Sequence, residues 1–272
     1  MMTTDLVGLL PAAGRGSRLG AIPCSKEIMP LGFQLQAIGD GRHWQPITAL
    51  ETHLKALRCA NVTRAAIIIS ESKADIVRYI GNGERYGISI TYLYQQQLSG
   101  MPFALDLATS WIGKATTVFS MPDTIIEPID TMMRVVEQHL TRPADVTLGL
   151  FQTTTPHKFG MVEVTSDAVI RRFIDKPLHT DLTLMWGLAV WSPRFTQYMS
   201  AFLKSITSSE KEIVLSDIFQ AALEGGLTFR GVVLEDARYR DIGTPEDFQA
   251  VVYDLALQQA SLLQSCDGFD AS

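Results

Sequence analysis

The fold and the candidate site of this 272-residue chain are organised around residues 6–32, LVGLLPAAGRGSRLGAIPCSKEIMPLG. The first six residues of this stretch are apolar and predict a buried strand, which then breaks into a small, Gly-rich loop. Gly14 and Gly16 allow backbone N–H groups to approach an anion closely, because glycine carries no Cβ. Three basic side chains close by would neutralise such an anion, namely Arg15, Arg18 and Lys26. The stretch therefore predicts a phosphate site at the end of a strand.

Composition and charge exclude several classes of protein. Hydrophobic residues make up 46% of the chain, which is enough for a full core, and the net charge of −6 argues against general affinity for nucleic acid or anionic membranes. No apolar run approaches the roughly 18 residues of a membrane span, and no signal peptide is evident. Three cysteines without CxxC spacing indicate free thiols in a reducing compartment. We therefore expect a cytoplasmic protein without a nucleic-acid or membrane partner.

Strands and helices alternate through the first half of the chain. Strands are predicted over residues 6–11, 64–70, 88–94, 116–121 and 145–151, and helices over 46–60, 72–80, 102–112 and 130–140. Residues 34–44 are polar and contain glycine, so they are predicted as a loop. Strands separated by helices of this length favour an α/β fold with a mostly parallel sheet covered on both faces. In such a sheet ligands bind at the carboxyl ends of the strands, where the Gly-rich loop and Asp123 both lie.

The second half has shorter connections. Strands are predicted over 161–164, 169–175, 184–191 and 227–234, helices over 193–203, 213–224 and 245–263, a turn over 239–244 and a frayed tail over 267–272. No linker separates the halves, so we expect one domain spanning residues 1–272. Within it, the character of the chain changes near residue 150, which divides it into about 1–150, about 151–245, and a closing helix and tail over 246–272.

The Gly-x-Gly pair alone permits several interpretations. A dinucleotide-binding fingerprint needs a third small residue where Leu19 stands, and a P-loop needs a Gly-Lys-Ser/Thr sequence that is absent. A plain glycine turn with surface arginines is the usual explanation for such a pair in isolation. Arg18, Lys26 and the MPL that follows favour a nucleotidyltransferase loop instead.

Further motifs follow in a fixed order along the chain. They are YLYQQQLSG at 92–100, TTVFSMPD at 116–123, KFGMVE at 158–163, IDKP at 174–177, EIVLSDI at 212–218 and YRDIGTPE at 239–246. With these motifs the chain resembles sugar-1-phosphate nucleotidyltransferases, especially glucose-1-phosphate thymidylyltransferases and uridylyltransferases, from about residue 6 to residue 248. The resemblance implies a Rossmann-like three-layer fold with a mixed, mainly parallel central sheet. It also implies an enzyme, commonly a homo-oligomer, that joins a nucleoside triphosphate, dTTP or UTP, to a sugar 1-phosphate and releases pyrophosphate.

The resemblance implies that residues of about 1–150 form a nucleotide-binding half and those of about 151–245 a sugar-phosphate-binding half. It also assigns site residues on the nucleotide side. The loop backbone would surround the triphosphate, and Gln95 and Gly100 would recognise the base. The nucleotide-binding residues it implies are Ala12, Ala13, Gly14, Gly16, Arg18, Gln95 and Gly100, and the catalytic residues are Arg18, Lys26 and Asp123. Asp123 and Asp241 would bind Mg²⁺, a cation that prefers carboxylate and phosphate oxygens.

On the acceptor side the resemblance implies four substrate-binding residues, Gly160, Asp175, Lys176 and Trp186. A phosphate oxygen of the acceptor would attack the α-phosphorus, so no general base is expected, because a phosphate dianion is already a nucleophile. This agrees with the scattered positions of the five histidines, His43, His53, His139, His157 and His179.

Several positions depart from the pattern of the family. The link between Arg18 and Lys26 is shorter by about two residues, Pro122 replaces a glycine, Asp175 replaces a glutamate and Trp186 is unusually bulky. Glu210 stands where relatives often carry a phosphate-binding arginine. These departures leave two alternatives open: a cytidylyltransferase for a small phosphorylated or phosphonate acceptor, or a non-catalytic homologue that senses nucleotide sugars.

Overall fold

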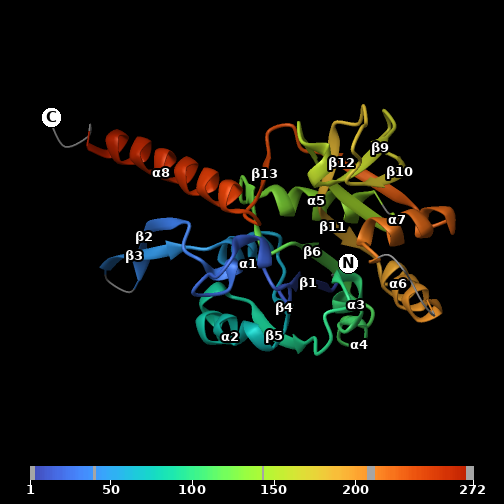
Figure 1. Ribbon diagram of the computed structural model, residues 1–272, viewed down its shortest axis with the longest axis horizontal. Helices are drawn as coiled ribbons and strands as arrows, with labels where there is room; N and C mark the ends of the chain where they lie inside the picture. Colours follow the sequence, from blue (N-terminus) through green and yellow to red (C-terminus); the bar gives the residue numbers. More distant parts are fainter. Residues whose placement is uncertain (1–3, 39–40, 143, 207–211, 268–272) are drawn as a thin grey trace.

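A nine-stranded mixed sheet forms the centre of the computed structural model, which describes residues 4–38, 41–142, 144–206 and 212–267 (Figure 1). The strand order is β10-β9-β11-β6-β1-β4-β5, with β8 paired to β11 and β12 paired to β8. The strands are β1 (Leu6–Pro11), β4 (Arg64–Ile69), β5 (Ser89–Tyr94), β6 (Thr116–Ser120), β8 (Val146–Gln152), β9 (Gly160–Val164), β10 (Ile170–Asp175), β11 (Leu184–Trp191) and β12 (Phe229–Val233). All of them except β10 and β11 run in the same direction. The predicted mixed, mainly parallel sheet is confirmed.

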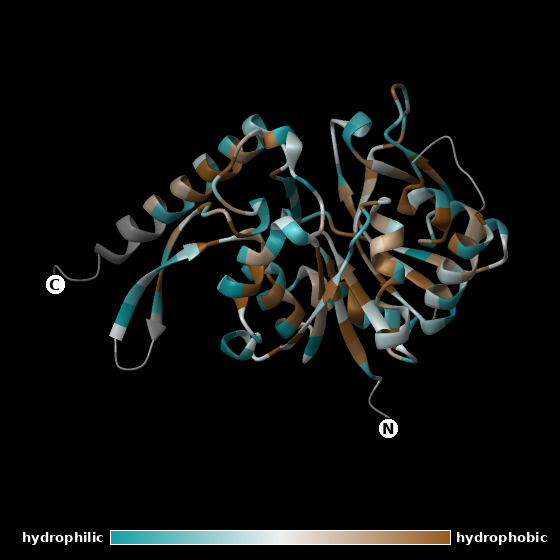
Figure 2. Ribbon diagram, turned by 60° about the horizontal axis from the view of Figure 1, so that its bottom comes forward, coloured by the Kyte–Doolittle hydropathy of each residue, from teal (hydrophilic) through white to brown (hydrophobic). Residues whose placement is uncertain are grey.

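Helices cover both faces of this sheet and make it the middle of three layers. The hydrophobic cluster on one face includes α1 (Ala49–Cys59), α2 (Ala74–Ile80) and α5 (Thr131–Thr141). The cluster on the other face includes α3 (Met101–Asp106), α4 (Thr109–Ile112), α6 (Pro193–Ser205) and α7 (Leu215–Glu224). Figure 2 shows the apolar residues gathered on the strands and on the helix sides that meet them. The single helix predicted over 102–112 is divided into α3 and α4.

Strand β1 contributes to both clusters because its side chains alternate between the two faces. Val7 and Leu9 belong to one cluster, and Leu10 belongs to the other. A Cβ added to Gly8 would lie 2.7 Å from Cδ1 of Leu57, so glycine at this position lets α1 pack directly on the strand. The start of the phosphate loop is thereby fixed by a strand that is buried on both sides.

The prediction of a loop over residues 34–44 is wrong. The chain forms an antiparallel hairpin of β2 (Gly32–Ile38) and β3 (Gly41–Ile47). Phe33, Leu35 and Trp44 are exposed, whereas Gln34 and Gln36 are half-buried. The alternation has the period of a strand, but its polar residues face the protein and its apolar residues face outward. Because the half-buried positions of β2 are polar, the sequence pattern did not predict a strand there.

The prediction of a turn over 239–244 is wrong in its first part. Residues Arg238–Asp241 form β13, which pairs antiparallel with β7 (Thr124–Glu127). Both strands are only four residues long and lie outside the central sheet, so neither contains an apolar run long enough to predict a strand from the sequence. The pair places Asp241 opposite Thr124, directly beside Asp123 in the chain.

The long helix α8 (Pro245–Asp267) extends away from the body of the protein beside the β2–β3 hairpin (Figure 1). Its first turns pack on a small third cluster that includes Leu31, Ile125, Ile242 and Val251. Further along, the side chain of Gln259 donates a hydrogen bond to the carbonyl of Phe33. None of the described helices combines the length and the apolar character needed to cross a membrane.

Candidate active site

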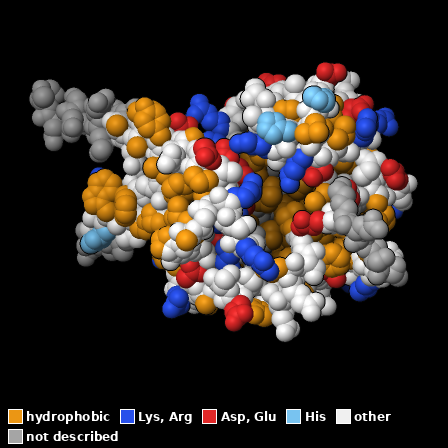
Figure 3. Space-filling model, viewed as in Figure 1, with side chains coloured by type: hydrophobic (Ala, Val, Ile, Leu, Met, Phe, Trp, Pro, Cys, Tyr) orange, Lys and Arg blue, Asp and Glu red, His pale blue; other side chains and the backbone are white. Residues whose placement is uncertain are grey.

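A pocket of about 190 Å³ opens where the carboxyl ends of β1 and β6 meet the second half of the chain. Figure 3 shows Lys and Arg side chains gathered near the middle of the face that is drawn there. The predicted site residues that line the pocket are Arg18, Asp123, Gly160, Asp175, Lys176, Trp186 and Asp241. A larger cavity of about 560 Å³ lies between the hairpin and α8, but it is lined by none of the predicted site residues.

The two predicted metal-binding aspartates converge through the β7–β13 pair. Asp123 follows β6 and Asp241 ends β13, and the amide of Ile242 donates a 3.2 Å hydrogen bond to the carbonyl of Asp123. Burial raises the pKa of Asp241, and the negative charge of Asp123 raises it further, against the opposing charges of Arg18 and Lys26. Two carboxylates are thus held close enough to interact in a partly desolvated place.

Lys26 reaches this pair of aspartates from the opening stretch of the chain. Its ammonium forms an ion pair with the carboxylate of Asp123 while the side chain is largely buried. Burial acts to lower the pKa of Lys26, but the Asp123 charge and hydrogen bond, followed by the charges of Glu27 and Asp241, raise it overall. The lysine is therefore kept charged at its place beside the aspartates that are predicted to bind the metal.

Side chains of α2 and of the short 3-10 turn before it (Glu71–Lys73) hold the residues on either side of Lys26. The backbone amide and the hydroxyl of Ser25 each donate a 2.6 Å hydrogen bond to the carboxylate of Asp75. On the other side, Lys73 lies 2.7 Å from Glu27, and both side chains are buried. The position of Lys26 is thus set by residues on either side of it in the chain.

Arg18 lies beside Asp241, and Gly243 makes room for it. A Cβ on Gly243 would lie 2.7 Å from Nη2 of Arg18 and 3.0 Å from a carboxylate oxygen of Asp241. The amide of Gly243 also donates a 3.0 Å hydrogen bond to that carboxylate. Sequence analysis did not single out Gly243, although it stands inside the DIGTPE motif. The shortened link between Arg18 and Lys26 still lets both side chains reach the aspartates.

The other predicted nucleotide-binding residues of the opening loop lie at the end of β1, outside the 190 Å³ pocket. Ala12 and Ala13 are buried, and the carbonyl of Ala13 accepts a 2.9 Å hydrogen bond from the Ser70 hydroxyl. Gly14 is exposed, and Gly16 has a positive φ of 66°, which glycine adopts without strain. At Gly14 and Gly16 the loop has no Cβ to cover its backbone, and Arg15 between them is exposed.

Gln95 and Gly100 are brought together after β5. Gln95 is buried, and its side-chain amide donates a 3.4 Å hydrogen bond to the carbonyl of Gly100. Gly100 has a φ of 104° at the start of α3. Like the loop residues, they do not line the 190 Å³ pocket, but Met101, the residue after Gly100, does.

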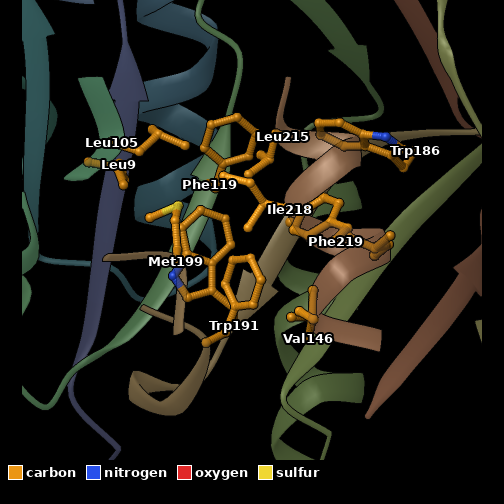
Figure 4. Packing of buried hydrophobic residues seen from close by; sticks show 14 of the residues in the cluster. Leu9, Leu105, Phe119, Val146, Trp186, Trp191, Met199, Leu215, Ile218 and Phe219 are labelled. Carbon is orange, nitrogen blue, oxygen red and sulfur yellow. The ribbon is translucent and has the colours of Figure 1, made fainter. Parts of the chain in front are cut away.

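Trp186 forms one wall of the pocket together with Gly160. The indole Nε1 donates a 3.1 Å hydrogen bond to the hydroxyl of Ser216, at the start of α7. A Cβ on Gly160 would lie 2.3 Å from that nitrogen, so only glycine fits here. Behind the wall the indole packs on Phe119 and Phe219, as Figure 4 shows. Ser216 lies within the predicted 212–218 segment but was not identified individually.

Asp175 and Lys176 face the pocket from the end of β10. Asp175 pairs with Gly160 in the β9–β10 register, and Lys176 has a positive φ of 43°. The backbone amide of Lys176 donates a 3.0 Å hydrogen bond to the carbonyl of Phe159. Lys158, which stands in the 158–163 motif but was not identified individually, also lines the pocket, and its ammonium lies 3.0 Å from Asp247 on α8. Glu210 lies outside the described residues.

The donor set of the aspartate pair fits a hard divalent cation. Burial raises the pKa of Asp241 and the charge of Asp123 raises it further, and a cation that prefers oxygen would offset both effects. Within the described part of the chain no group of three or more His, Cys, Asp or Glu side chains could hold a metal by itself. Such a cation would therefore depend on Asp123, Asp241 and oxygens from substrate or water.

Comparisons with known proteins give a family match and several relatives. Residues 7–258 match the family model described as nucleotidyl transferase. The low-salt glycan biosynthesis nucleotidyltransferase Agl11 of Haloferax volcanii is 26% identical over 93% of this chain and 68% of its own length. A glucose-1-phosphate thymidylyltransferase of Streptomyces antibioticus is 26% identical over 89% of this chain and 64% of its own length. The chain thus spans about two thirds of the length of these relatives.

The fold has close structural counterparts as well. The structure of a UTP-bound UGPase from Acinetobacter baumannii superposes with a TM-score of 0.73, at 16% identity and with 93% of each chain covered. The recognised resemblance is confirmed: this chain belongs to the nucleotidyl transferase family, alongside sugar-1-phosphate nucleotidyltransferases.

Proposed function

We propose that this chain transfers a nucleotidyl group from dTTP or UTP to a sugar 1-phosphate and releases pyrophosphate. The observation that carries this proposal is the pocket in which residues of both halves meet. Arg18 faces it from the Gly-rich loop, Asp123 from the end of β6 and Asp241 from the end of β13. Lys176 and Trp186 face it from the end of β10 and from β11. One set suits a triphosphate and the other suits a phosphorylated acceptor.

The proposed chemistry requires positioning and charge neutralisation more than covalent work by the protein. A phosphate oxygen of the acceptor attacks the α-phosphorus in line, a new P–O bond forms, and the bond to pyrophosphate breaks. Arg18 and Lys26 would neutralise charge on the triphosphate, and Lys176 would hold the acceptor phosphate. No side chain needs to remove a proton, because the attacking phosphate is already ionised.

Asp123 and Asp241 would hold Mg²⁺ in this proposal. When bound, the ion supplies charge neutralisation to phosphate oxygens. Burial and the charge of Asp123 raise the pKa of Asp241, whereas the charges of Arg18 and Lys26 act to lower it and so favour the ionised carboxylate that such binding requires.

A second class of acceptor is supported by the pocket wall around Trp186. The indole, the Ser216 hydroxyl and the missing side chain of Gly160 bound a pocket of only about 190 Å³. A small phosphorylated or phosphonate compound, used with CTP, would fit such a pocket as well as a sugar does.

The test incubates the full chain with Mg²⁺, each of dTTP, UTP, CTP, ATP and GTP, and a panel of sugar 1-phosphates and small phosphorylated or phosphonate acceptors. Pyrophosphate release is measured for every pair. Release with a sugar 1-phosphate supports the proposal, and release only with CTP and a small acceptor supports the second candidate. Binding of nucleotide sugars without release from any pair would favour a non-catalytic sensor.

A further inference from the structure

His53 is a buried polar side chain next to the candidate site that the proposed chemistry does not use. It lies on α1, does not line the 190 Å³ pocket, and has only 2% of its surface exposed. The imidazole contacts the two ends of the short segment that carries Asp123.

Both ring nitrogens have partners, and the partners fix the tautomer. Nε2 lies 2.9 Å from the carbonyl oxygen of Thr124, which can only accept, so Nε2 carries the hydrogen and donates. Nδ1 lies 2.8 Å from the hydroxyl of Ser120 and accepts from it. Burial lowers the pKa of His53 to about 4, although the Thr124 carbonyl and the charge of Asp123 act to raise it, so the ring is neutral.

The two residues that His53 bonds flank Asp123 in the chain. Ser120 is the last residue of β6 and Thr124 is the first residue of β7, and Asp123 lies between them. The hydroxyl of Thr124 donates a further 2.8 Å hydrogen bond to the carbonyl of Met121, which closes the segment on itself. Pro122 adds stiffness, because its ring fixes φ.

We infer that His53 is a positioning residue that holds Asp123 in place by bonding Ser120 and Thr124 at the two ends of its segment. This inference rests on the proposed function of the same site. His53 does not line the pocket, so it acts on Asp123 through Ser120 and Thr124. A shift of about 1 Å in a residue of the reacting constellation can reduce turnover by roughly 100-fold.

The test compares two substitutions of His53 with a matched control. His53→Leu keeps a bulky side chain but removes both hydrogen bonds. His53→Gln has a side-chain amide whose N–H can replace the imidazole Nε2–H as the donor to the Thr124 carbonyl. The control is His139→Leu, since His139 is also a buried helix residue with a single 2.9 Å hydrogen bond, to the Thr147 hydroxyl, away from the pocket. Steady-state pyrophosphate release is measured with the best substrate pair of the unsubstituted chain.

His53→Leu is expected to lower kcat roughly 10- to 100-fold while KM for the triphosphate stays within about twofold. His53→Gln is expected to recover most of kcat, and His139→Leu is expected to leave kcat unchanged even where its melting temperature falls. Equal losses of kcat in His53→Leu and His139→Leu, or no loss in His53→Leu, would overturn the inference.

A second readout needs no turnover. Amide hydrogen exchange of peptides covering residues 116–127 is expected to accelerate in His53→Leu and not in His53→Gln or His139→Leu. Unchanged exchange in His53→Leu overturns the positioning role. Absence of pyrophosphate release from the unsubstituted chain, with exchange responding as expected, would instead overturn the proposed function.

Discussion

The ammonium of Lys73 lies 2.7 Å from the carboxylate of Glu27, and both side chains are buried next to Lys26. Burial raises the pKa of Glu27, while the charge and the hydrogen bond of Lys73 lower it. The ion pair therefore anchors the segment that delivers Lys26 to Asp123.

Removing Lys73 is expected to destabilise the fold strongly. Lys73→Met leaves Glu27 as an uncompensated buried carboxyl, a change that typically costs roughly 3–5 kcal/mol. The double substitution Glu27→Gln with Lys73→Met removes both charges and is expected to recover a large part of that loss. Urea denaturation of the two single variants and the double variant measures the coupling, and additive losses would contradict the account of the pair.

Gly160→Ala tests whether the pocket wall formed by Trp186 and Gly160 contacts the acceptor. The new Cβ would lie 2.3 Å from Trp186 Nε1 and 2.8 Å from the Ser216 hydroxyl, so the indole has to move. KM for the acceptor is expected to rise about tenfold or more, with KM for the triphosphate little changed. Gly32→Ala is the control, because its Cβ would meet its nearest neighbour at an ordinary 3.7 Å. A Gly160→Ala variant with unchanged acceptor kinetics would show that this wall does not contact the acceptor.

The stability of the protein is expected to fall between pH 6.5 and pH 4 through His139. Burial lowers its pKa from 6.5 to about 4 in the folded chain, against a weaker opposing effect of Asp145. The unfolded chain binds the additional proton in this range, so the free energy of unfolding decreases as the pH decreases. The contribution is roughly 2 kcal/mol between pH 7.5 and pH 5. Urea denaturation of His139→Gln at both pH values is expected to show a shallower dependence, and an identical dependence would contradict the assignment.

We expect the protein to self-associate through the outward face of the β2–β3 hairpin. Phe33, Leu35 and Trp44 share that face and are exposed, Trp44 by 59%. A two-fold contact places such a face against its own copy and removes it from water. Trp44→Ser is expected to shift the chain toward the monomer in analytical ultracentrifugation. Leu140→Ser, at an exposed apolar residue of α5, serves as the control, and equal sedimentation of both variants would argue against the hairpin as the contact.

Sequence reasoning predicted the sheet well where a strand has its own apolar run. β1 and β11 have the predicted bounds, and the Gly-rich loop and Asp123 lie where strand ends meet. The fold class follows from such local patterns, because buried parallel strands must be apolar on both faces.

Sequence reasoning failed where a structure depends on partners far along the chain. The short strands β7 and β13 exist only through each other, and the hairpin turns its polar face inward. His53 contacts Thr124 across 71 positions, and Trp186 contacts Ser216 across 30. No local pattern marks such residues, so a single sequence offers no signal for them beyond the motifs in which Gly243 and Ser216 happen to stand.

The central claim is that Lys26, Asp123 and Asp241 form one catalytic centre for nucleotidyl transfer. The most direct measurement is pyrophosphate release by the unsubstituted chain and by Asp123→Asn, with Mg²⁺, dTTP or UTP and glucose 1-phosphate or another sugar 1-phosphate. Lys204→Met, which removes an exposed lysine of α6, serves as a control for handling and folding. We expect release from the unsubstituted chain and the control, and a loss of at least about 100-fold in Asp123→Asn with its melting temperature retained. Near-equal release from Asp123→Asn and the unsubstituted chain would contradict the claim.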